Sequence, residues 1–315
     1  MRRRTALLSG LAIALPSAAR AAWPERALRL LCAFPPGSAT DIAARAFAEA
    51  LGSPLGQPVV VENRGGASGN IATVAVRNAT DGHTGLVHGA AFSVNPALYA
   101  NPGFAIADFR TIAILGSTPA AFVVKADGPI RNLADLLAAA RARPLDYASS
   151  GAGTVPRLGA ELLFRRLAQV EVQHVAFPPA QAVTAVVSGH VPLAVVALPT
   201  AMGLVRGGQL RVIAVGSAQR DPLLPDAPTV AEQGFPGFDV GAWNALFVPR
   251  AMPGEAIARL EAECAKLIAA PEIRARLAPA GLTPGTLTGE AAQAFVLREA
   301  SIWAEVVRAS GATPD

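Results

Sequence analysis

The sequence predicts an α/β protein of two domains whose sheets are mainly parallel. Short apolar strands alternate with helices along the chain, and this alternation restarts after a strand expected at 121–125. The chain has 315 residues, enough for about two domains, and 52% of them are hydrophobic. A hydrophobic fraction of this size excludes disorder as the default.

The first half of the chain opens with a buried strand. Residues 28–34 form an apolar run that only Arg29 interrupts. Apolar side chains recur with helical spacing over 41–51, and Gly52 and Pro54 are predicted to end this helix. The other elements expected are strands at 59–61, 84–88, 111–115 and 121–125, a helix over 70–76 and a helix that ends at 98–99.

The second half repeats the pattern and then becomes helical. Strands are expected at 145–148, 170–176, 191–197, 210–215 and 243–248. Helices are expected at 133–141, 158–167, 255–269, 272–277 and 290–309. No internal repeat or low-complexity segment interrupts this order.

Residues 1–21 are predicted to be a signal peptide. Three arginines at positions 2–4 precede a short apolar stretch at 6–16, and small residues at 19 and 21 fit cleavage after Ala21. The apolar stretch is too short to span a membrane. Export by the Sec route is expected, and the arginine pair before Thr5 also fits a twin-arginine signal. The protein is therefore expected in the periplasm.

The mature chain is expected to be near neutral. The formal net charge is +4, and the signal segment holds four arginines and no acid, so its removal leaves zero. Nucleic-acid binding needs a basic patch, and this composition argues against one. Cys32 falls in a predicted strand and Cys264 in a predicted helix, so we expect two buried free thiols, although export would also permit a disulfide. No metal-ligand spacing is present, and no metal or cofactor is predicted.

Three loops of glycine and hydroxyl residues, at 37–40, 64–70 and 149–154, each follow a predicted strand and precede a helix. In open α/β sheets, ligands bind beyond the carboxyl ends of the strands. The first N–H groups of a helix are unpaired and carry partial positive charge. Several such loops around one cleft would bind a carboxylate or a phosphate without lysine or arginine. The alternative is that these residues only cap their helices.

Nucleotide and catalytic motifs are incomplete. The GAGTVP segment at 151–156 has Pro156 where a dinucleotide fingerprint needs its third glycine, and no glycine loop ends in a lysine. No serine stands in a nucleophile elbow, and the four histidines are scattered. A serine hydrolase using Ser93 or Ser149 is the minor alternative, and no catalytic residue is predicted.

The chain resembles the Bug family of periplasmic solute receptors, the binding components of tripartite tricarboxylate transporters. The similar segments are WPER at 23–26, FPPGSATD at 34–41, GQPVVVENR at 56–64, GN at 69–70, DGHT at 81–84 and NPALY at 95–99. The most specific segment is LPDAPTVAEQG at 224–234, which GF at 237–238, Trp243 and FVP at 247–249 support. The resemblance covers nearly all of the chain after the signal peptide.

The resemblance implies the type II periplasmic binding fold, with a ligand cleft between two α/β domains. Domain 1 would comprise 22–123 plus 243–315, and domain 2 would comprise 124–242, with crossings near Val123–Val124 and Trp243. Trp243 would then lie at the hinge, where its fluorescence reports closure. The ligand-facing positions implied are Phe34, Pro36, Gly37, Ser38, Thr40, Gly66, Ala67, Ser68, Gly69, Asn70, Ser93, Ser149, Gly153, Thr154, Arg157, Phe177 and Ala197.

Domain 2 departs from the family pattern. The usual Pro-Tyr-Lys/Arg-Gly stretch reads AFPP at 176–179, and Pro192 and Val196 replace acids. Arg157 stands where a histidine is usual, and Ser38-Ala39 replaces Gly-Ser. Because this wall lacks a carboxylate for an ammonium group, we expect a ligand with one anchored carboxylate and an apolar or aromatic body, and not an amino acid. Arg157 is either a second carboxylate clamp or a solvated side chain.

The function expected is that of a monomeric periplasmic receptor. It would capture a small organic carboxylate and deliver it to the membrane permease of a tripartite transporter. The alternatives are a ligand-presenting partner of a signalling receptor and a hydrolase on a binding-protein fold.

Overall fold

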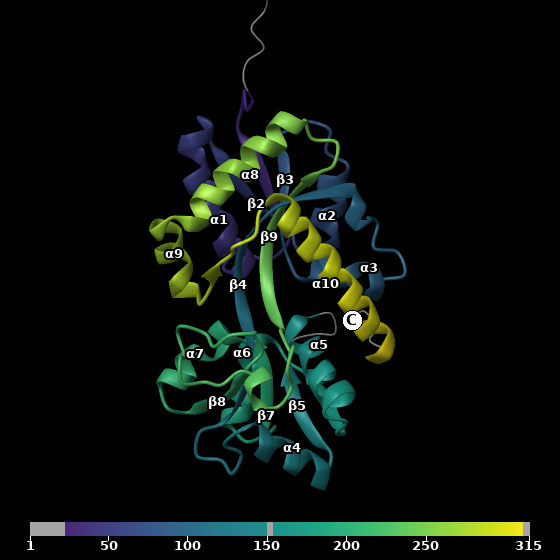
Figure 1. Ribbon diagram of the computed structural model, residues 1–315, viewed down its shortest axis with the longest axis vertical. Coiled ribbons are helices and arrows are strands. Elements are labelled where there is room, and N and C mark those ends of the chain that lie inside the picture. The colour runs from purple at the N-terminus through teal and green to yellow at the C-terminus, as the bar shows by residue number, and fades with distance from the viewer. Residues whose placement is uncertain (1–22, 150–153, 311–315) are drawn as a thin grey trace, which may run out of the picture.

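The structure, a computed structural model, describes residues 23–149 and 154–310. Figure 1 shows two lobes stacked along the long axis, with strands β4 and β9 running between them. The predicted signal peptide lies outside the described residues. No helix in the described ranges is long and apolar enough to cross a membrane.

The elements that precede the second lobe are β1 (Leu28–Cys32), α1 (Ala39–Leu55), β2 (Val59–Asn63), η1 (Ala67–Gly69), α2 (Asn70–Arg77), β3 (Thr84–Gly89), α3 (Ala91–Leu98), η2 (Ile106–Asp108) and β4 (Phe109–Lys125). The second lobe contains α4 (Leu133–Ala142), β5 (Leu145–Ser149), α5 (Val155–Glu161), η3 (Leu162–Leu167), β6 (Val172–Ala176), α6 (Pro179–Val187), β7 (Leu193–Ala197), α7 (Leu198–Arg206), β8 (Leu210–Val215) and η4 (Ala231–Gln233). The chain returns through β9 (Gly241–Pro249), α8 (Gly254–Ala269), α9 (Pro271–Leu277), η5 (Ala278–Ala280), β10 (Thr283–Pro284) and α10 (Gly289–Ser310).

One strand joins the two lobes. The sequence predicted separate strands at 111–115 and 121–125, and this was wrong, because β4 runs unbroken for 17 residues. Gly116 and Pro119 interrupt the apolar run in the sequence, yet both stay in the ladder, opposite Asn244 and Gly241 of β9. The partners of β4 change from β9 to β7 and β8 between Pro119 and Ala120. This change lies four residues before the crossing expected at Val123–Val124, and the domain bounds stay a prediction.

Parallel pairs build the outer parts of both lobes. In the first lobe β1 pairs with β2 and β3, and in the second β5 pairs with β6 and β7, all in parallel. The long strands β4 and β9 add antiparallel pairs at the centre. This arrangement confirms the α/β class with two domains.

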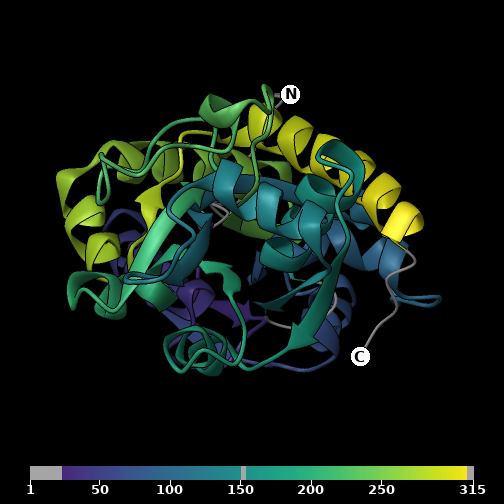
Figure 2. The same cartoon turned by 90° about the horizontal axis from the view of Figure 1, so that it is seen from below.

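Helices cover both faces of each sheet, because alternate strand residues point to opposite sides. In β1, Leu30 and Cys32 join the cluster under α1, α8 and α9, while Leu31 joins the cluster under α2, α3 and α10. Figure 2 shows α10 in yellow and the purple N-terminal segments on opposite sides of the molecule. Cys32 and Cys264 are both buried free thiols, as expected.

Two helix predictions need correction. Helix α1 does not end at Gly52 and Pro54 but continues to Leu55, where Gly56 takes the left-handed conformation at φ 70°. Helices α6 and α7 were not predicted, and each has a proline in its first turn. Proline is tolerated there because the first N–H groups of a helix have no intrahelical partner.

The lobes touch where Gly281, after η5, approaches Pro199 of α7. Gly281 has φ +64°, and a Cβ there would lie 2.7 Å from Pro199 Cγ. We expect Gly281→Ala to lower the free energy of unfolding by about 1–3 kcal/mol, measured by urea unfolding. Gly208→Ala is the matched control, because Gly208 has φ +69° with nothing within 4 Å. Equal losses in the two variants would contradict a steric contribution from Pro199.

Candidate ligand-binding site

The strand ends of the two lobes face each other across a short stretch of β4. Strand β3 ends at Gly89, which lies opposite Asn244 of β9 and so level with Gly116 of β4. Strand β7 runs the other way and ends at Ala197, opposite Ala120. Gly116 and Ala120 are four residues apart, about 13 Å in an extended strand. The ends of β3 and β7 therefore both lie close to the region between the lobes.

The first loop leads into the N-terminus of α1. Ser38 is the N-cap, and its side chain accepts a hydrogen bond from the N–H of Asp41. The capping alternative is therefore correct for this hydroxyl. The N–H groups of Ala39 and Thr40, next along the chain, donate to no protein atom within the described part of the chain. These two groups lie at the positive end of the helix dipole and can accept an anion.

Asp41 fixes the conformation of this loop. Its carboxylate accepts hydrogen bonds from Gly37 N, Arg45 Nε and Asn63 Nδ2 at 2.8–3.1 Å. Burial by itself would raise the pKa of Asp41, but the bonds from Arg45, Asn63 and Gly37 bring the pKa below its ordinary value of 3.8. The loop is thus held in place by a carboxylate that stays ionised at neutral pH.

The second loop contains four consecutive residues with positive φ. Gly66, Ala67, Ser68 and Gly69 have φ of 118°, 47°, 51° and 91°. Ala67 and Ser68 are not glycine, so each stores about 1 kcal/mol of backbone strain or more. Successive left-handed residues point their N–H groups in roughly one direction, as the first turn of a helix does, and unpaired N–H groups of this kind can bind an anion. The N–H groups of Ala67 and Ser68 have no acceptor among the residues that the structure describes.

Buried side chains hold the second loop in this conformation. Asn95 donates from Nδ2 to Ser68 O and to Asn70 Oδ1, at 3.0 and 2.6 Å, and the Tyr99 hydroxyl donates to Ser68 Oγ. His88 lies directly behind Gly69, where a Cβ would fall 2.2 Å from the imidazole Nε2. Burial lowers the pKa of His88 to about 4, so this support is neutral.

Strand β9 joins the first loop to the crossing strands. The Thr40 hydroxyl donates to Asn244 Oδ1 at 2.6 Å. A Cβ on Gly89 would lie 3.6 Å from both of these oxygens, so the three residues meet at one point. Phe34 packs edge-on against His88 and completes this wall, and Pro36 and Gly37 lie exposed at its rim.

The second wall is built from the ends of β5 and β6. Ser149 Oγ lies 2.8 Å from His174 Nε2, and Phe177 N donates to Ser149 O. This serine–histidine pair has the contact of a nucleophile with its base, but Ser149 is 0% exposed. Thr154 is the N-cap of α5. Gly153 lies outside the described residues.

Arg157, in the first turn of α5, is the cation of this wall. Its Nε is buried and has no partner among the described residues, and the guanidinium takes part in no ion pair there. The neighbouring carboxylate, Glu161, is already bound by Arg165 and by the Tyr147 hydroxyl. Among the residues that the structure describes, Arg157 therefore forms no ion pair.

Two of the predicted ligand-facing positions, Ser93 and Ala197, belong to neither of the two loops of the first wall. The Ser93 hydroxyl is buried and donates to Val296 O of α10, so it points into the core. Ala197 caps α7 beside the crossing strand. Four further residues of this region, Asn244, His88, Asn95 and Tyr99, were not predicted to belong to the site, although Asn95 and Tyr99 lie in the NPALY segment at 95–99.

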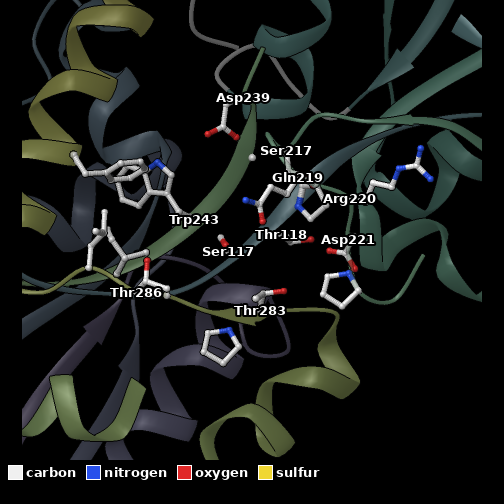
Figure 3. Close-up of a pocket in the computed structure, with 18 of the residues that line it drawn as sticks. Ser117, Thr118, Ser217, Gln219, Arg220, Asp221, Asp239, Trp243, Thr283 and Thr286 are labelled. Carbon is white, nitrogen blue, oxygen red and sulfur yellow. The ribbon is translucent and has the colours of Figure 1, made fainter. Parts of the chain in front are cut away.

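A separate cavity lies between the lobes at β4 and β9 (Figure 3). None of the described residues predicted to face the ligand lines it. Trp243 is in its wall, while the next residue, Asn244, bonds to Thr40. Successive strand residues point to opposite faces, so this cavity and the loop site lie on opposite sides of β9.

Similar solved structures define the class as periplasmic binding proteins. Rpa4515 of R. palustris with adipate shares 31% identity at a TM-score of 0.80, covering 93% of this chain and 100% of that one. MatC of Rhodopseudomonas palustris with bound malate shares 30% sequence identity at a TM-score of 0.75. The match covers 90% of this chain and 100% of that one. The periplasmic binding protein BugD shares 30% sequence identity at a TM-score of 0.76. The match covers 92% of this chain and 99% of that one.

The family follows from the sequence matches. The model of the tripartite tricarboxylate transporter family receptor matches residues 43–311, and the chain belongs to this family. The UPF0065 protein in the tcbD-tcbE intergenic region of Pseudomonas sp. strain P51 is 36% identical over 290 residues, 89% of this chain and 86% of that one. Protein BugT of Bordetella pertussis is 30% identical over 297 residues, which are 92% of this chain and 91% of that one. The expected resemblance is confirmed.

The Asp41 network predicts a pH-dependent stability difference. A lowered folded-state pKa means that the ionised carboxylate stabilises the fold above pH 3.8, and that this contribution is lost as the pH falls through the folded-state pKa. We expect Asp41→Asn to cost about 1–2 kcal/mol at pH 7. The difference from the unsubstituted protein should shrink as urea unfolding is repeated below pH 3.8. The exposed Asp146→Asn serves as control, and a pH-independent Asp41→Asn effect would refute the assignment.

Proposed function

We propose that this protein is a periplasmic receptor that binds a small organic carboxylate between its two domains and delivers it to the membrane permease of a tripartite transporter. The observation that carries the proposal is the run of positive φ at 66–69, which leaves the N–H groups of Ala67 and Ser68 without an acceptor among the described residues. The helix start at Ala39 and Thr40 supplies further donors to the same wall.

The remaining parts of this proposal follow from the sequence. Residues 1–21 direct export, and the mature chain acts as a monomer. Domain 1 comprises 22–123 plus 243–315, and domain 2 comprises 124–242. The receptor performs no chemistry, since the buried hydroxyl of Ser149 offers no approach for an ester carbonyl. Presentation of the ligand to a signalling receptor would use the same site, so ligand-dependent pull-down of the permease decides between these roles.

We propose that the ligand has two carboxylates separated by an apolar body. One carboxylate meets the N–H groups of the first domain, and the second meets Arg157, whose Nε has no protein acceptor in the described ranges. Adipate, the ligand of one similar structure, has this form, with four methylenes between its carboxylates. Nothing described in the second wall offers a carboxylate to an ammonium group, so glutamate and aspartate bind weakly.

The loop site is tested by a charge at Ala67. The side chain of Ala67 is exposed, and its backbone is left-handed. Asp and Asn tolerate this backbone conformation better than Ala does, so neither substitution is expected to disturb folding. In calorimetric titrations with adipate, we expect Ala67→Asp to weaken binding at least about tenfold by repulsion, while Ala67→Asn binds within about twofold of the original. Equal affinities of the two variants would exclude this loop as the carboxylate site.

The role of Arg157 is tested by comparing one and two carboxylates. Arg157→Leu should weaken adipate binding about tenfold or more and leave hexanoate binding unchanged, because hexanoate lacks the second carboxylate. Arg141→Leu, a substitution at an exposed arginine of α4, is the control. If both acids lose affinity equally, Arg157 acts on the fold and not on the second carboxylate.

A further inference from the structure

The run of positive φ at 66–69 is supported by a helix that lies elsewhere in the chain. Ala67 and Ser68 are not glycine, so a left-handed backbone at these two positions is less stable than a right-handed one. Residues of this kind keep such a conformation only where their surroundings hold it. Helix α3 supplies much of this support, and its Asn95 lies 27 positions from Ser68 along the chain.

The groups that contact the run act on different residues of it. His88 and the Thr73 hydroxyl both contact Gly69, and glycine adopts positive φ without strain. Asn95 and Tyr99 instead contact Ser68, where the same conformation is strained. The support that the conformation needs most therefore comes from the two side chains of α3.

Asn95 uses both hydrogens of its side-chain amide on this loop. Its Nδ2 lies 3.0 Å from Ser68 O and 2.6 Å from Asn70 Oδ1. The bond to Ser68 O holds the peptide group between Ser68 and Gly69, because that carbonyl belongs to it. The bond to Asn70 holds the first residue of α2. Asn95 thus fixes the run at its centre and at its end.

The amide of Asn95 is retained at a cost to stability. Its Oδ1 is buried and has no hydrogen-bond partner within the described ranges. An unpaired buried acceptor destabilises a fold, and an apolar side chain at position 95 would have none. The presence of an amide here is therefore explained by the two hydrogen bonds that it donates, and departures of this kind from the most stable choice are typical of functional sites.

Helix α3 is itself fixed in the core, so Asn95 has a rigid base. Phe92 stacks on Phe247 of β9 with the ring centroids 4.1 Å apart, and Ser93 donates to a main-chain carbonyl of α10. These contacts attach α3 to the sheet and to a second helix. Support from side chains that are locked in place keeps a binding site in its productive geometry.

We propose that Asn95 is a positioning residue of the carboxylate site, and that its two hydrogen bonds keep Ala67 and Ser68 in the conformation that leaves their N–H groups open to an anion. Asn95 is 0% exposed, so it acts through the loop and not by contact with the ligand. The Tyr99 hydroxyl, 3.1 Å from Ser68 Oγ, is a second support of the same residue. This role rests on the proposed function, because it concerns the same loop.

The affinity for adipate, measured by calorimetric titration, is the first test. Asn95→Ala frees the loop to leave the left-handed conformation and should weaken adipate binding about tenfold. Tyr99→Phe removes a single hydroxyl, keeps the fold, and should weaken adipate binding about threefold. Val94→Ala is the control, because Val94 of the same helix is 0% exposed and belongs to the apolar core. Its adipate affinity should stay within about twofold of the original.

Ser68→Gly separates positioning from a general loss of structure. Glycine has no strain at positive φ, so the loop then needs less support. In the Ser68→Gly background, Asn95→Ala should weaken adipate binding by about threefold or less, compared with about tenfold in the original sequence. Equal losses in the two backgrounds would mean that Asn95 does not act through the conformation of Ser68, and the proposal would be wrong.

Crystal structures of the variants without ligand keep this proposal separate from the proposed function. We expect Ala67 and Ser68 to leave positive φ in Asn95→Ala and to keep it in Val94→Ala. A run of positive φ that survives in Asn95→Ala overturns the positioning role, whatever happens to adipate. A rearranged loop with unchanged adipate affinity instead shows that the loop is not the carboxylate site, and the positioning role then falls together with that part of the proposed function.

Discussion

The hydrogen-bond ladder of β4 is the constraint on which the arrangement of the molecule depends. Its stretch from Phe109 to Pro119 pairs with β9, with two register shifts, and its stretch from Ala120 to Lys125 pairs with β7 and β8, so a single strand belongs to the sheets of both lobes. The register of β4 decides how far the strand ends of one lobe stand from those of the other. A slip of one residue would turn each of its side chains to the opposite face. The main-chain hydrogen bonds of β4 therefore set the distance between the strand ends of the two lobes. Side-chain contacts such as that of Thr40 with Asn244 add to this arrangement.

Much of the fold could be predicted, because the local sequence pattern indicates most of the helices and strands. The apolar run at 28–34 and the helical spacing over 255–269 both give the element at nearly the observed bounds. The failures occurred where the local signal and the tertiary context disagree. Pro119 lacks an N–H and would weaken an isolated strand, but it lies where β4 exchanges partners. Pro54 falls in the last turn of α1, where little helix remains to be broken.

The candidate site could be predicted in its composition and not in its geometry. Glycine and hydroxyl residues after the strands indicated main-chain anion binding, and the loops at 37–40 and 64–70 do converge. Nothing in the sequence marks Ala67 and Ser68 as left-handed, because that conformation is imposed by distant residues such as Asn95 and His88. The bond from Thr40 to Asn244 joins positions 204 apart in the chain, a separation that no local pattern reveals.

The apolar cluster on the α10 side has a consequence for how the molecule comes apart. Leu31 and Phe247 of the first lobe and Leu136 and Tyr147 of the second belong to one continuous buried set, which passes through Phe122 and Trp243. Melting either lobe alone would expose the shared part of this set to water, at a cost that the surviving lobe could not recover. Because the two lobes share one buried apolar set, they are expected to unfold together as one cooperative unit.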